Sequence, residues 1–503
     1  MKAYQAKIEA LLIKSRRRKE VFAGLPVGQK QSSVGVVDLT DWLGESGGVR
    51  LMKGVRDPAG AFSITLSDRP HKHALDTLAA LIEPMDVIEF RMAHDPSEYA
   101  KSNNGKLPIV MRGLVSEVRR SVTMGADGRP SRTVTVTGQD WGKLLQILRI
   151  IYLNNVALGD NILTTYKFFE KHSAGQPKQK PVADFIADVL KGFLNPYLAD
   201  LAGQNSGGNT IGTTVGAITA EVTAKGLVDA PGVSSWPGGS LHQMLSFFGD
   251  VGPFNELYTE DRKDDVCLVL RPNPFELPDG AMIQSGVKRR PYSVVAKWQP
   301  GDVPDLAISD ADVVAENLGR SDAGVANVFW VTSKAWVLNN NGTMRLAAQD
   351  GQSENYLLLD YLNSKASVFG IRQMDVESNL GDPRLRWGDG QKEAAVSTDK
   401  ITYRDWIGER RAILAQQNRD NSIFEQGSFR LRGNERLRAG MYLTITRGDF
   451  QPRHYVTRVE HEFSPFRGFF TTAHVERGTG YILRQQRANI SAWALETNQS
   501  GIT

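Results

Sequence analysis

Cysteine is almost absent from this sequence, because the chain of 503 residues has one, Cys267. One cysteine forms neither an internal disulfide nor a cysteine metal cluster, so stability must come from packing or from association with other chains. Cys267 lies in the apolar run VCLVL. This setting predicts a buried thiol without chemistry of its own.

The sequence also lacks long apolar runs and a strong excess of one charge. No stretch approaches the roughly 20 apolar residues that cross a bilayer, and the basic cluster at residues 16–19 follows the short apolar stretch, the reverse of a secretory signal. We therefore expect synthesis in the cytoplasm and no stable membrane insertion. Lys and Arg number 60 and Asp and Glu 56, for a net charge of +4. This near balance argues against a protein that coats nucleic acid.

Signature motifs of common enzymes are missing as well. The sequence has neither a G-x-S-x-G nucleophile elbow nor a phosphate-binding G-x-x-x-x-G-K-[ST] loop, and His461-Glu462 lacks the second histidine of a zinc protease. What remains is an ordinary globular composition, 41% hydrophobic and 23% charged, with a length typical of about three domains. The 48 glycines and many Val/Thr-rich segments favour a β-rich chain.

Residues 34–142 have the pattern of a small β-barrel. Phe62, Ile64 and Leu66 alternate with polar residues, as a half-buried strand requires. A short helix is expected near residues 75–82, a turn at Pro84-Met85-Asp86, a bend near Gly113 and a hairpin at Asp127-Gly128. Before this region, residues 1–33 are expected to form a basic helical arm.

Residues 143–262 change to helical periodicity. A stripe from Val182 to Leu194 predicts an amphipathic helix, and Ser240 and Gly249 are placed to cap another. Residues 202–239 are rich in Gly and Thr and are expected to form a long irregular loop.

The rest of the chain predicts a second barrel with an insertion. Residues 263–335 and 422–480 carry the strand pattern, residues 336–421 form a mixed insertion and residues 481–503 a C-terminal tail. Helices are expected near Tyr356–Lys365 and Arg404–Asn418, the second preceded by the capping pattern Thr402-x-x-Asp405. The two β regions run in the same order: FSITLSD, EPMDVIEF, MRGLVSEVRRSV and RTVTVTG are echoed by SFRLRG, RAGMYLTI, RHYVTRVEHEFS and FFTTAHVERG. This echo predicts two copies of one fold.

Several polar and aromatic residues are candidates for functional groups. His71 and His73 could share one side of a strand as metal ligands, but no third ligand is evident. Paired carboxylates could serve a glycosidase, arginines near Gly433–Gly440 could pair with an acidic partner or merely face solvent, and tryptophans could anchor a core or interface. These carboxylates, arginines and tryptophans, together with three histidines of the last strands, are His454, His461, His474, Asp86, Glu89, Asp310, Asp312, Arg432, Arg436, Arg438, Trp236, Trp330, Trp336 and Trp406. No catalytic, cofactor-binding or metal residue is predicted, and the chain is expected not to be an enzyme.

The order of the segments resembles a known family. DPAGAFSITLSD, LIEPMDVIEFRM, MRGLVSEVRRSV and RTVTVTGQDWGKLL resemble the first barrel of phage baseplate central hub proteins, which include the contractile-tail hub and late-control D-type tail proteins. ISDADVVAENLGRSDAGVANVFWV, SFRLRGNERLRAGMYLTI, HYVTRVEHEFS and FFTTAHVERG resemble the second. The likeness covers about residues 34–150 and 300–480.

The resemblance implies an α+β fold, mainly β, with two similar tube-type β-barrel domains and helical insertions. It implies a homotrimer in the virion tail baseplate that adapts a hexameric tail tube ring to a trimeric central spike protein and continues the tube lumen for DNA ejection. Tape measure protein and wedge or inner baseplate proteins are further partners in such assemblies, with no cofactor and no specific nucleic-acid binding. Two alternatives stay open, a tail-associated cell-wall hydrolase and a barrel that binds single-stranded nucleic acid.

Overall fold

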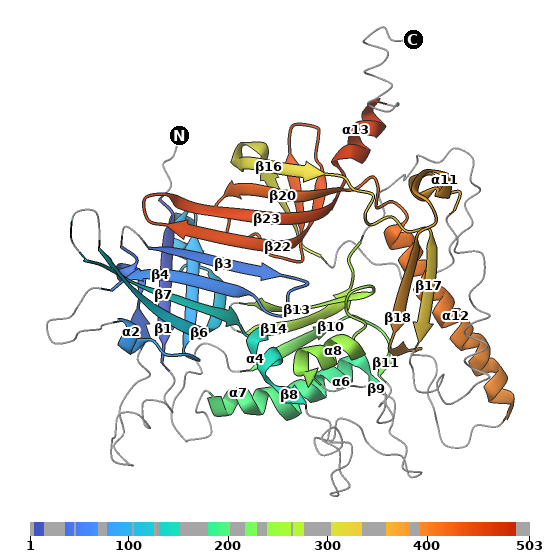
Figure 1. The fold of residues 1–503 in the computed structure, drawn as a ribbon, viewed down its shortest axis with the longest axis horizontal. Helices are drawn as coiled ribbons and strands as arrows, with labels where there is room; N and C mark the ends of the chain where they lie inside the picture. Colours follow the sequence, from blue (N-terminus) through green and yellow to red (C-terminus); the bar gives the residue numbers. More distant parts are fainter. Residues whose placement is uncertain are drawn as a thin grey trace, which may run out of the picture.

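The computed structural model describes residues 5–14, 36–44, 47–68, 78–102, 105–124, 128, 130–150, 180–201, 217–228, 239–262, 265–275, 303–333, 359–382 and 393–488. In this part of the chain the protein is mainly β, with helices set below and beside a large sheet (Figure 1). The described helices include none long and apolar enough to span a bilayer.

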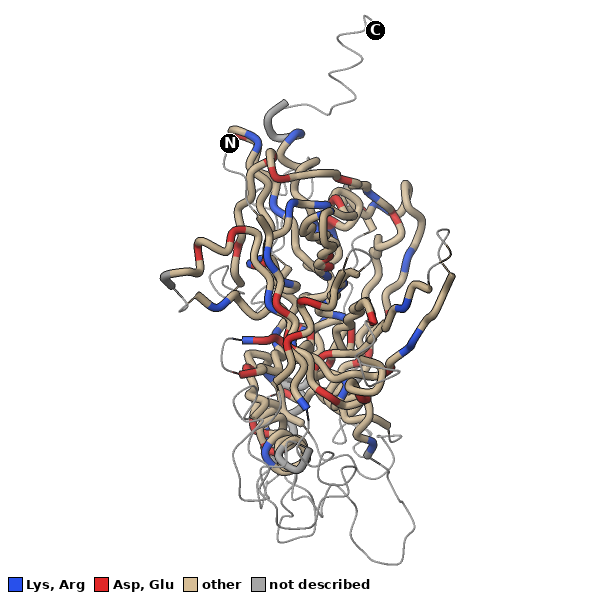
Figure 2. Tube along the Cα trace, turned by 90° about the vertical axis from the view of Figure 1, so that its left-hand side faces the viewer, with Lys and Arg blue, Asp and Glu red and all other residues tan. Residues whose placement is uncertain are grey.

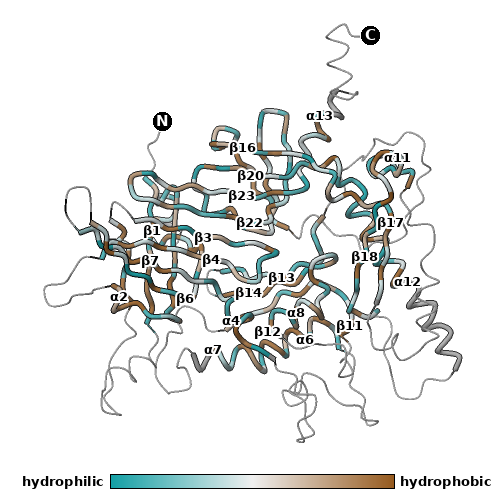
Figure 3. Tube along the Cα trace, viewed as in Figure 1, coloured by the Kyte–Doolittle hydropathy of each residue, from teal (hydrophilic) through white to brown (hydrophobic). Residues whose placement is uncertain are grey.

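The N-terminal part forms what we call the first unit of the sheet. Its apolar and polar residues alternate, so that one face is buried: Phe62, Ile64 and Leu66 are at most 3% exposed. Figure 3 shows this alternation of hydropathy along the strands. The strands of the first unit are β1 (Lys7–Ile13), β2 (Val36–Asp38), β3 (Gly48–Gly54), β4 (Ala61–Ser67), β5 (Val87–Ala93), β6 (Ile109–Met124) and β7 (Pro130–Asp140).

The C-terminal part forms the second unit, with a buried core of its own around Phe429, Leu431 and Val459. From region 263–335 only the two middle strands, at Asp305–Ser309 and Val313–Gly319, join it, because the strand that holds Cys267 and the strand at Val328–Ser333 pair elsewhere. The strands of the second unit are β15 (Asp305–Ser309), β16 (Val313–Gly319), β20 (Glu425–Arg432), β21 (Tyr442–Thr446), β22 (Arg453–Ser464) and β23 (Gly468–Gly478).

The two units are not two closed barrels. They belong to one open sheet of 13 strands in the order β16-β20-β23-β22-β3-β4-β7-β6-β5-β1-β2, with β21 beside β22 and β15 beside β21. In Figure 1 the red strands of the second unit lie directly above the blue and teal strands of the first. Alternating residues predict a strand, but closure depends on which end strands pair, and here β3 pairs with β22 rather than closing its own unit.

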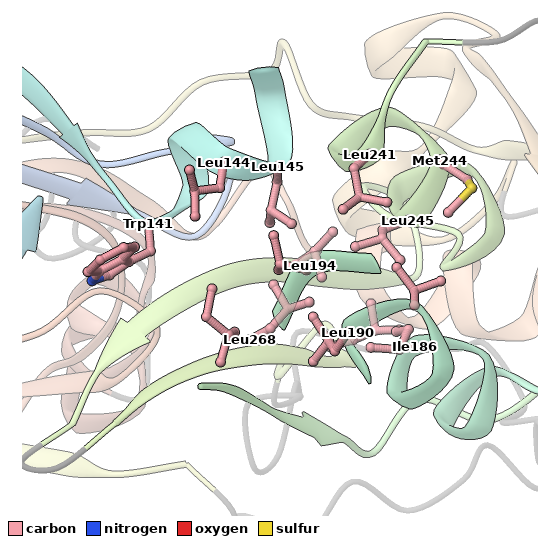
Figure 4. Close-up of a cluster of buried hydrophobic side chains, with 14 of the residues drawn as sticks. Trp141, Leu144, Leu145, Ile186, Leu190, Leu194, Leu241, Met244, Leu245 and Leu268 are labelled. Carbon is pink, nitrogen blue, oxygen red and sulfur yellow. The ribbon is translucent and has the colours of Figure 1, made fainter. Parts of the chain in front are cut away.

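A helical layer covers a smaller three-stranded sheet. β10 (Ile218–Val222), β14 (Val266–Pro272) and β13 (Asn255–Asp261) lie against α4 (Gly142–Ile147), α6 (Val182–Val189), the π-helical turn η3 (Leu190–Leu194), α7 (Asn195–Leu201) and α8 (Leu241–Phe248). Figure 4 shows their leucines meeting in one cluster, which includes Leu145, Leu194, Leu245 and Leu268. The predicted stripe from Val182 and the Ser240 cap, which accepts from the Gln243 N–H at 3.2 Å, are confirmed.

Four local predictions are wrong. Residues 7–13 form strand β1, not a helix, because they pair along their whole length with β5; residues 16–19 lie outside the described part. The loop 202–239 contains β10, whose Ile218 is buried. In place of a helix at 356–365, the described residues hold a 3-10 turn at 362–364. The capping pattern at Thr402 is internal to a helix that starts at Glu393.

The remaining elements are short or peripheral. They are η1 (Thr40–Trp42), α2 (Leu78–Leu81), η2 (Pro96–Glu98), α3 (Tyr99–Ser102), β8 (Arg149–Ile150), β9 (Lys180–Pro181), β11 (Leu227–Val228), β12 (Gly239–Ser240), η6 (Asp310–Asp312), β17 (Val328–Ser333), η8 (Leu362–Ser364), α11 (Ala366–Phe369), β18 (Gln373–Ser378), β19 (Leu380–Gly381), α12 (Glu393–Asn418) and α13 (Gly480–Ala488).

Candidate functional site: the seam between the two units

The central strands of the two units pair in the same order. In the first unit β4 pairs with β7, β7 with β6 and β6 with β5; in the second β20 pairs with β23, β23 with β22 and β22 with β21, always antiparallel. β3 flanks β4 as β16 flanks β20. The sequence echo therefore extends to strand pairing. A difference lies at the other side, where β1 is antiparallel to β5 but β15 is parallel to β21.

Rows of inward side chains across the strands also correspond. Each central row crosses three strands and places mostly buried apolar residues on the core face. The rows are Ile64, Val136 and Val118 in the first unit and Phe429, Ala473 and Val459 in the second.

The turn that launches the short strand docks in the same way in both units. Met85, with φ 71°, donates its N–H to the carbonyl of Val115 at 2.8 Å; Gly440, with φ 85°, donates to the carbonyl of Val456 at 2.8 Å. In each unit the N–H of that valine then donates to the carbonyl that follows the turn residue, at 2.8 and 2.9 Å. The predicted turn at residues 84–86 is confirmed, and its counterpart has the same backbone geometry.

The long strand of each unit bulges immediately after that valine. The register against the neighbouring strand skips Ser116 in β6 and Thr457 in β22. A bulge bends a strand and strengthens its twist. The bend expected near Gly113 is thus found three residues later, and past it each long strand leaves its short partner.

Past the bulge, β22 forms the seam with β3. Residues 458–463 pair antiparallel with residues 49–54. On the core face Val459, His461 and Leu51 are nearly inaccessible to solvent. On the outer face the Arg50 guanidinium lies 2.6 Å from a Glu460 carboxylate oxygen and 3.7 Å from one of Glu462.

The seam continues beyond the paired residues. The Val55 N–H donates to the Thr457 carbonyl at 2.9 Å, and Arg458 donates two hydrogen bonds to Asp57, at 2.8 and 3.0 Å. A planar guanidinium that binds both carboxylate oxygens fixes orientation as well as distance. The two units are therefore held in one defined arrangement.

A buried ionic group ties the seam to β13. The ammonium of Lys53 donates to the carboxylate of Asp261 and lies 3.2 Å from that of Asp140, which also accepts from the Thr259 hydroxyl at 2.9 Å. Burial opposes the charge on Lys53, but the two carboxylates more than offset it and raise its pKa. The group links the sheet to the smaller one beneath it.

A small cavity lies beside this group. Its volume is about 40 Å³, and its lining includes Leu51, Lys53, Tyr258, Leu437 and His461. That space suits a few water molecules. Small-molecule sites are roughly ten times larger, so this cavity does not suggest a substrate pocket.

The candidate catalytic carboxylates each lie beside a cation. Asp86 lies 2.7 Å from the Lys14 ammonium, and Glu89 accepts from Arg91 at 2.6 Å and from Arg112 at 3.0 Å. Asp310 lies 2.6 Å from Arg447, and Asp312 lies 3.6 Å from Arg432. These ion pairs give the carboxylates structural partners.

The histidines of the second unit pack within it. His454 is fully buried against the Phe429 ring at 4.9 Å, and His461 lies 3.0 Å from the Thr471 hydroxyl through Nδ1. Burial lowers the pKa of His461 to about 4. His474 lies 3.3 Å from Glu460. The described residues hold no cluster of three metal-ligating side chains, and His71 and His73 lie outside them.

The arginines of the turn before β21 contact their own chain. Arg436 pairs with Glu98 of the first unit, and Arg438 lies 3.2 Å from Glu260 of β13. Trp406 is buried and donates to the Leu380 carbonyl at 3.2 Å, whereas Trp330 is 39% exposed. Trp236 and Trp336 lie outside the described residues.

Sequence reasoning missed the seam. Arg50 and Glu460 are 410 positions apart, and no local pattern relates them. The signal that could have indicated it is the repeated order of the sequence segments, since two units with the same strand order have equivalent edge strands that can pair with each other.

Comparisons with known proteins return structures only, because no family model and no curated protein matches the chain. The tail protein from Neisseria meningitidis is 11% identical, with 94% of this chain and 97% of that chain covered and a TM-score of 0.43. The 43 kDa tail protein of prophage MuSo2 from Shewanella oneidensis is 11% identical, with 93% and 98% covered and a TM-score of 0.44. An E. coli component of the type VI secretion system is 9% identical, with 85% and 72% covered and a TM-score of 0.37.

Proposed function

We propose that this chain is a structural subunit of a phage tail baseplate, a hub that forms a homotrimer on the tail axis. One observation carries the proposal: a single chain contains two units with the same strand order, the same docked turn and the same bulge. Its sequence segments resemble those of baseplate hub proteins in the same order.

The repeat supports a role in symmetry matching. Three copies with two similar units each would present six similar units around one axis. A hexameric tail tube ring would then meet a similar surface six times. Each contact would repeat, and the ring would close without unequal gaps.

The parts that occur once per chain support a threefold partner. The helical layer of α4, α6 and α8 with β10, β13 and β14 lies to one side of the large sheet (Figure 1), and the described residues of the second unit include no counterpart to it. In a trimer it would appear three times. That side suits the trimeric central spike, and the repeated units suit the tube.

The charge distribution fits a lumen through which DNA passes. Lys and Arg are interspersed with Asp and Glu over the described part of the chain (Figure 2), and the net charge is +4. Strong phosphate contacts would hold DNA and make its passage depend on salt. A near-neutral wall would let it move.

Sedimentation of the purified chain tests the proposal. We expect a stable trimer, because obligate interfaces bury at least about 2,000 Å². Projection images of that trimer by electron microscopy should show six similar lobes around a central hole. A chain that stays monomeric at every accessible concentration would overturn the proposal.

The partners can be tested next with the tube and spike proteins of the same virion. The trimer should bind one end of polymerised tail tubes and, by the opposite face, the spike trimer. Binding of both partners to one face would contradict the assignment of the two sides.

A further inference from the structure

The long strands β6 and β22 have equivalent neighbours on one side, β7 and β23, but differ on the other side. On that side β22 pairs with β21 up to the bulge and with β3 beyond it. β6 carries β5 up to its bulge, but beyond it no described strand pairs with that edge over residues 117–124. Val122 and Met124 on this stretch are 53% and 73% exposed. An open edge with exposed apolar side chains is a site for strand addition.

The strand that would fit this edge is present at the far end of the sheet. β3 pairs with β4 on one side and β22 on the other, whereas its counterpart β16 pairs with β20 alone among the described strands. Val314, the residue skipped by the register shift in β16, is 54% exposed. Thus one chain offers one acceptor edge and one donor edge of matching kinds.

We propose that β16 of one copy pairs antiparallel with the outer half of β6 of the next copy, in the way that β3 pairs with β22 within the chain. The inference deepens the proposed function and rests on it, since it names the contact that would join the copies. The contact is head-to-tail, and such contacts close into a ring when their rotation allows it.

The seam also fixes the register of the proposed contact. Counting from Val456 and its counterpart Val115, the seam residues 461 and 462 correspond to 120 and 121. Phe62 of β4 and Gly427 of β20 occupy equivalent positions, and their partners are Leu51 of β3 and Leu318 of β16. Residues 51 and 50 of β3 therefore correspond to residues 318 and 317 of β16. His461 lies opposite Leu51 and Glu462 opposite Arg50. The register therefore places Arg120 opposite Leu318 and Ser121 opposite Asn317.

The side chains of the two edges are compatible in this register. Val122 lies opposite Glu316, which pairs with Arg447 of its own chain. Arg120, 3.8 Å from Asp68 of its own chain, is diagonal to the Glu316 carboxylate and within reach of it as a long side chain. Leu318 is partly buried and would be covered by the incoming strand. The seam within the chain likewise joins an arginine, Arg50, to carboxylates across the strands.

Paired cysteines test the register directly, because the chain has a single buried cysteine of its own. The double variant Ser121→Cys/Asn317→Cys should form disulfides between copies under mild oxidation, since opposite residues in antiparallel strands lie about 4.5–5.5 Å apart. Non-reducing gels should show covalent dimers and trimers in place of most of the monomer. The matched control is Glu117→Cys/Asn317→Cys, four residues out of register on the same face, a shift of about 13 Å.

The outcomes separate this inference from the proposed function. A trimer with cross-links in the first variant and at least about tenfold fewer in the control supports both. A trimer in which the first variant fails to cross-link, forms only intramolecular disulfides or matches the control overturns the strand pairing and leaves the hub. A monomer by sedimentation overturns the hub and the pairing together.

Discussion

Met85 and Gly440 occupy the same place in the two units of the sheet. Both have left-handed backbone conformations, with φ of 71° and 85°, and both donate their N–H to a valine carbonyl at 2.8 Å. Gly440 meets the conformational demand without strain, whereas Met85 adopts it with a side chain. Because the residues differ and the geometry is the same, the turn is a requirement of the unit and not of a particular residue.

Adding a methyl group at Gly440 should destabilise the protein more than the same change at a free turn. A Cβ at Gly440 would lie 2.9 Å from Arg271 Nη2 and from the Tyr258 hydroxyl. A Cβ at Gly448, where φ is 60°, would have no neighbouring atom within 4 Å. We expect Gly448→Ala to cost about 1 kcal/mol for its backbone alone and Gly440→Ala about 2–3 kcal/mol. Urea unfolding measures both, and equal losses would show that the docked turn relaxes freely.

Local patterns predicted the strands and the main helices well. Alternation in FSITLSD and helical spacing from Val182 to Leu194 are complete within a few residues, so the burial of one face follows from the sequence. The Ser240 cap needs only its own turn. These elements were predictable because their causes are local.

Pairing between distant segments was not predictable in this way. The run Ala10–Ile13 is apolar at consecutive positions, which fits a helix or a strand, and its contact with β5 decides for the strand. The sequence predicted two separate barrels, but alternation of apolar and polar residues does not determine which end strands pair, and so it does not determine whether a sheet closes. The seam and the Lys53–Asp261 pair depend on tertiary contacts between residues far apart in the chain.

Charged residues at core positions of the second unit should prevent folding. Leu431 and Val459 are at most 2% exposed on the inner face of β20 and β22, as the sequence predicted. Leu431→Asp or Val459→Asp would bury an unpaired carboxylate at a cost of several kcal/mol. We expect insoluble protein, with Arg432→Ala on the exposed face as a soluble control. Native-like circular dichroism from either aspartate variant would refute the register of these strands.

Removing Lys53 should cost far more stability than removing Arg50 three positions away. Lys53→Met leaves Asp261 and Asp140 buried without their cation, for an expected loss of about 3–5 kcal/mol. Arg50 is 61% exposed in its ion pairs, so Arg50→Met should cost less than about 1 kcal/mol. Denaturant midpoints for the two variants give the comparison, and similar losses would mean that the buried ion pair adds little.

The protein should lose stability in acid through His461. Burial holds the pKa of this imidazole at about 4 in the folded state against an ordinary value of 6.5, so the unfolded chain takes up the proton first as the pH falls. The loss begins below pH 6.5 and is complete near pH 4, where it reaches about 3 kcal/mol. Unfolding free energies at pH 7.5 and 4.5 should differ more in the native chain than in His461→Gln. An unchanged difference would show that other groups carry the acid sensitivity.

An acidic residue at Val122 should block assembly without affecting the fold. Val122 is 53% exposed on the open edge of β6, so Val122→Asp replaces an exposed side chain in the monomer but faces Glu316 of the next copy in the proposed register. A second carboxylate covered by the incoming strand directly opposite that of Glu316 costs more than the 1.4 kcal/mol that changes affinity tenfold. We therefore expect the trimer to weaken at least about tenfold in sedimentation, with an unchanged denaturant midpoint for the monomer. Ile371→Asp, at a position 75% exposed and away from both edges, is the matched control. A trimer of Val122→Asp as stable as that of Ile371→Asp would exclude the edge of β6 from the interface.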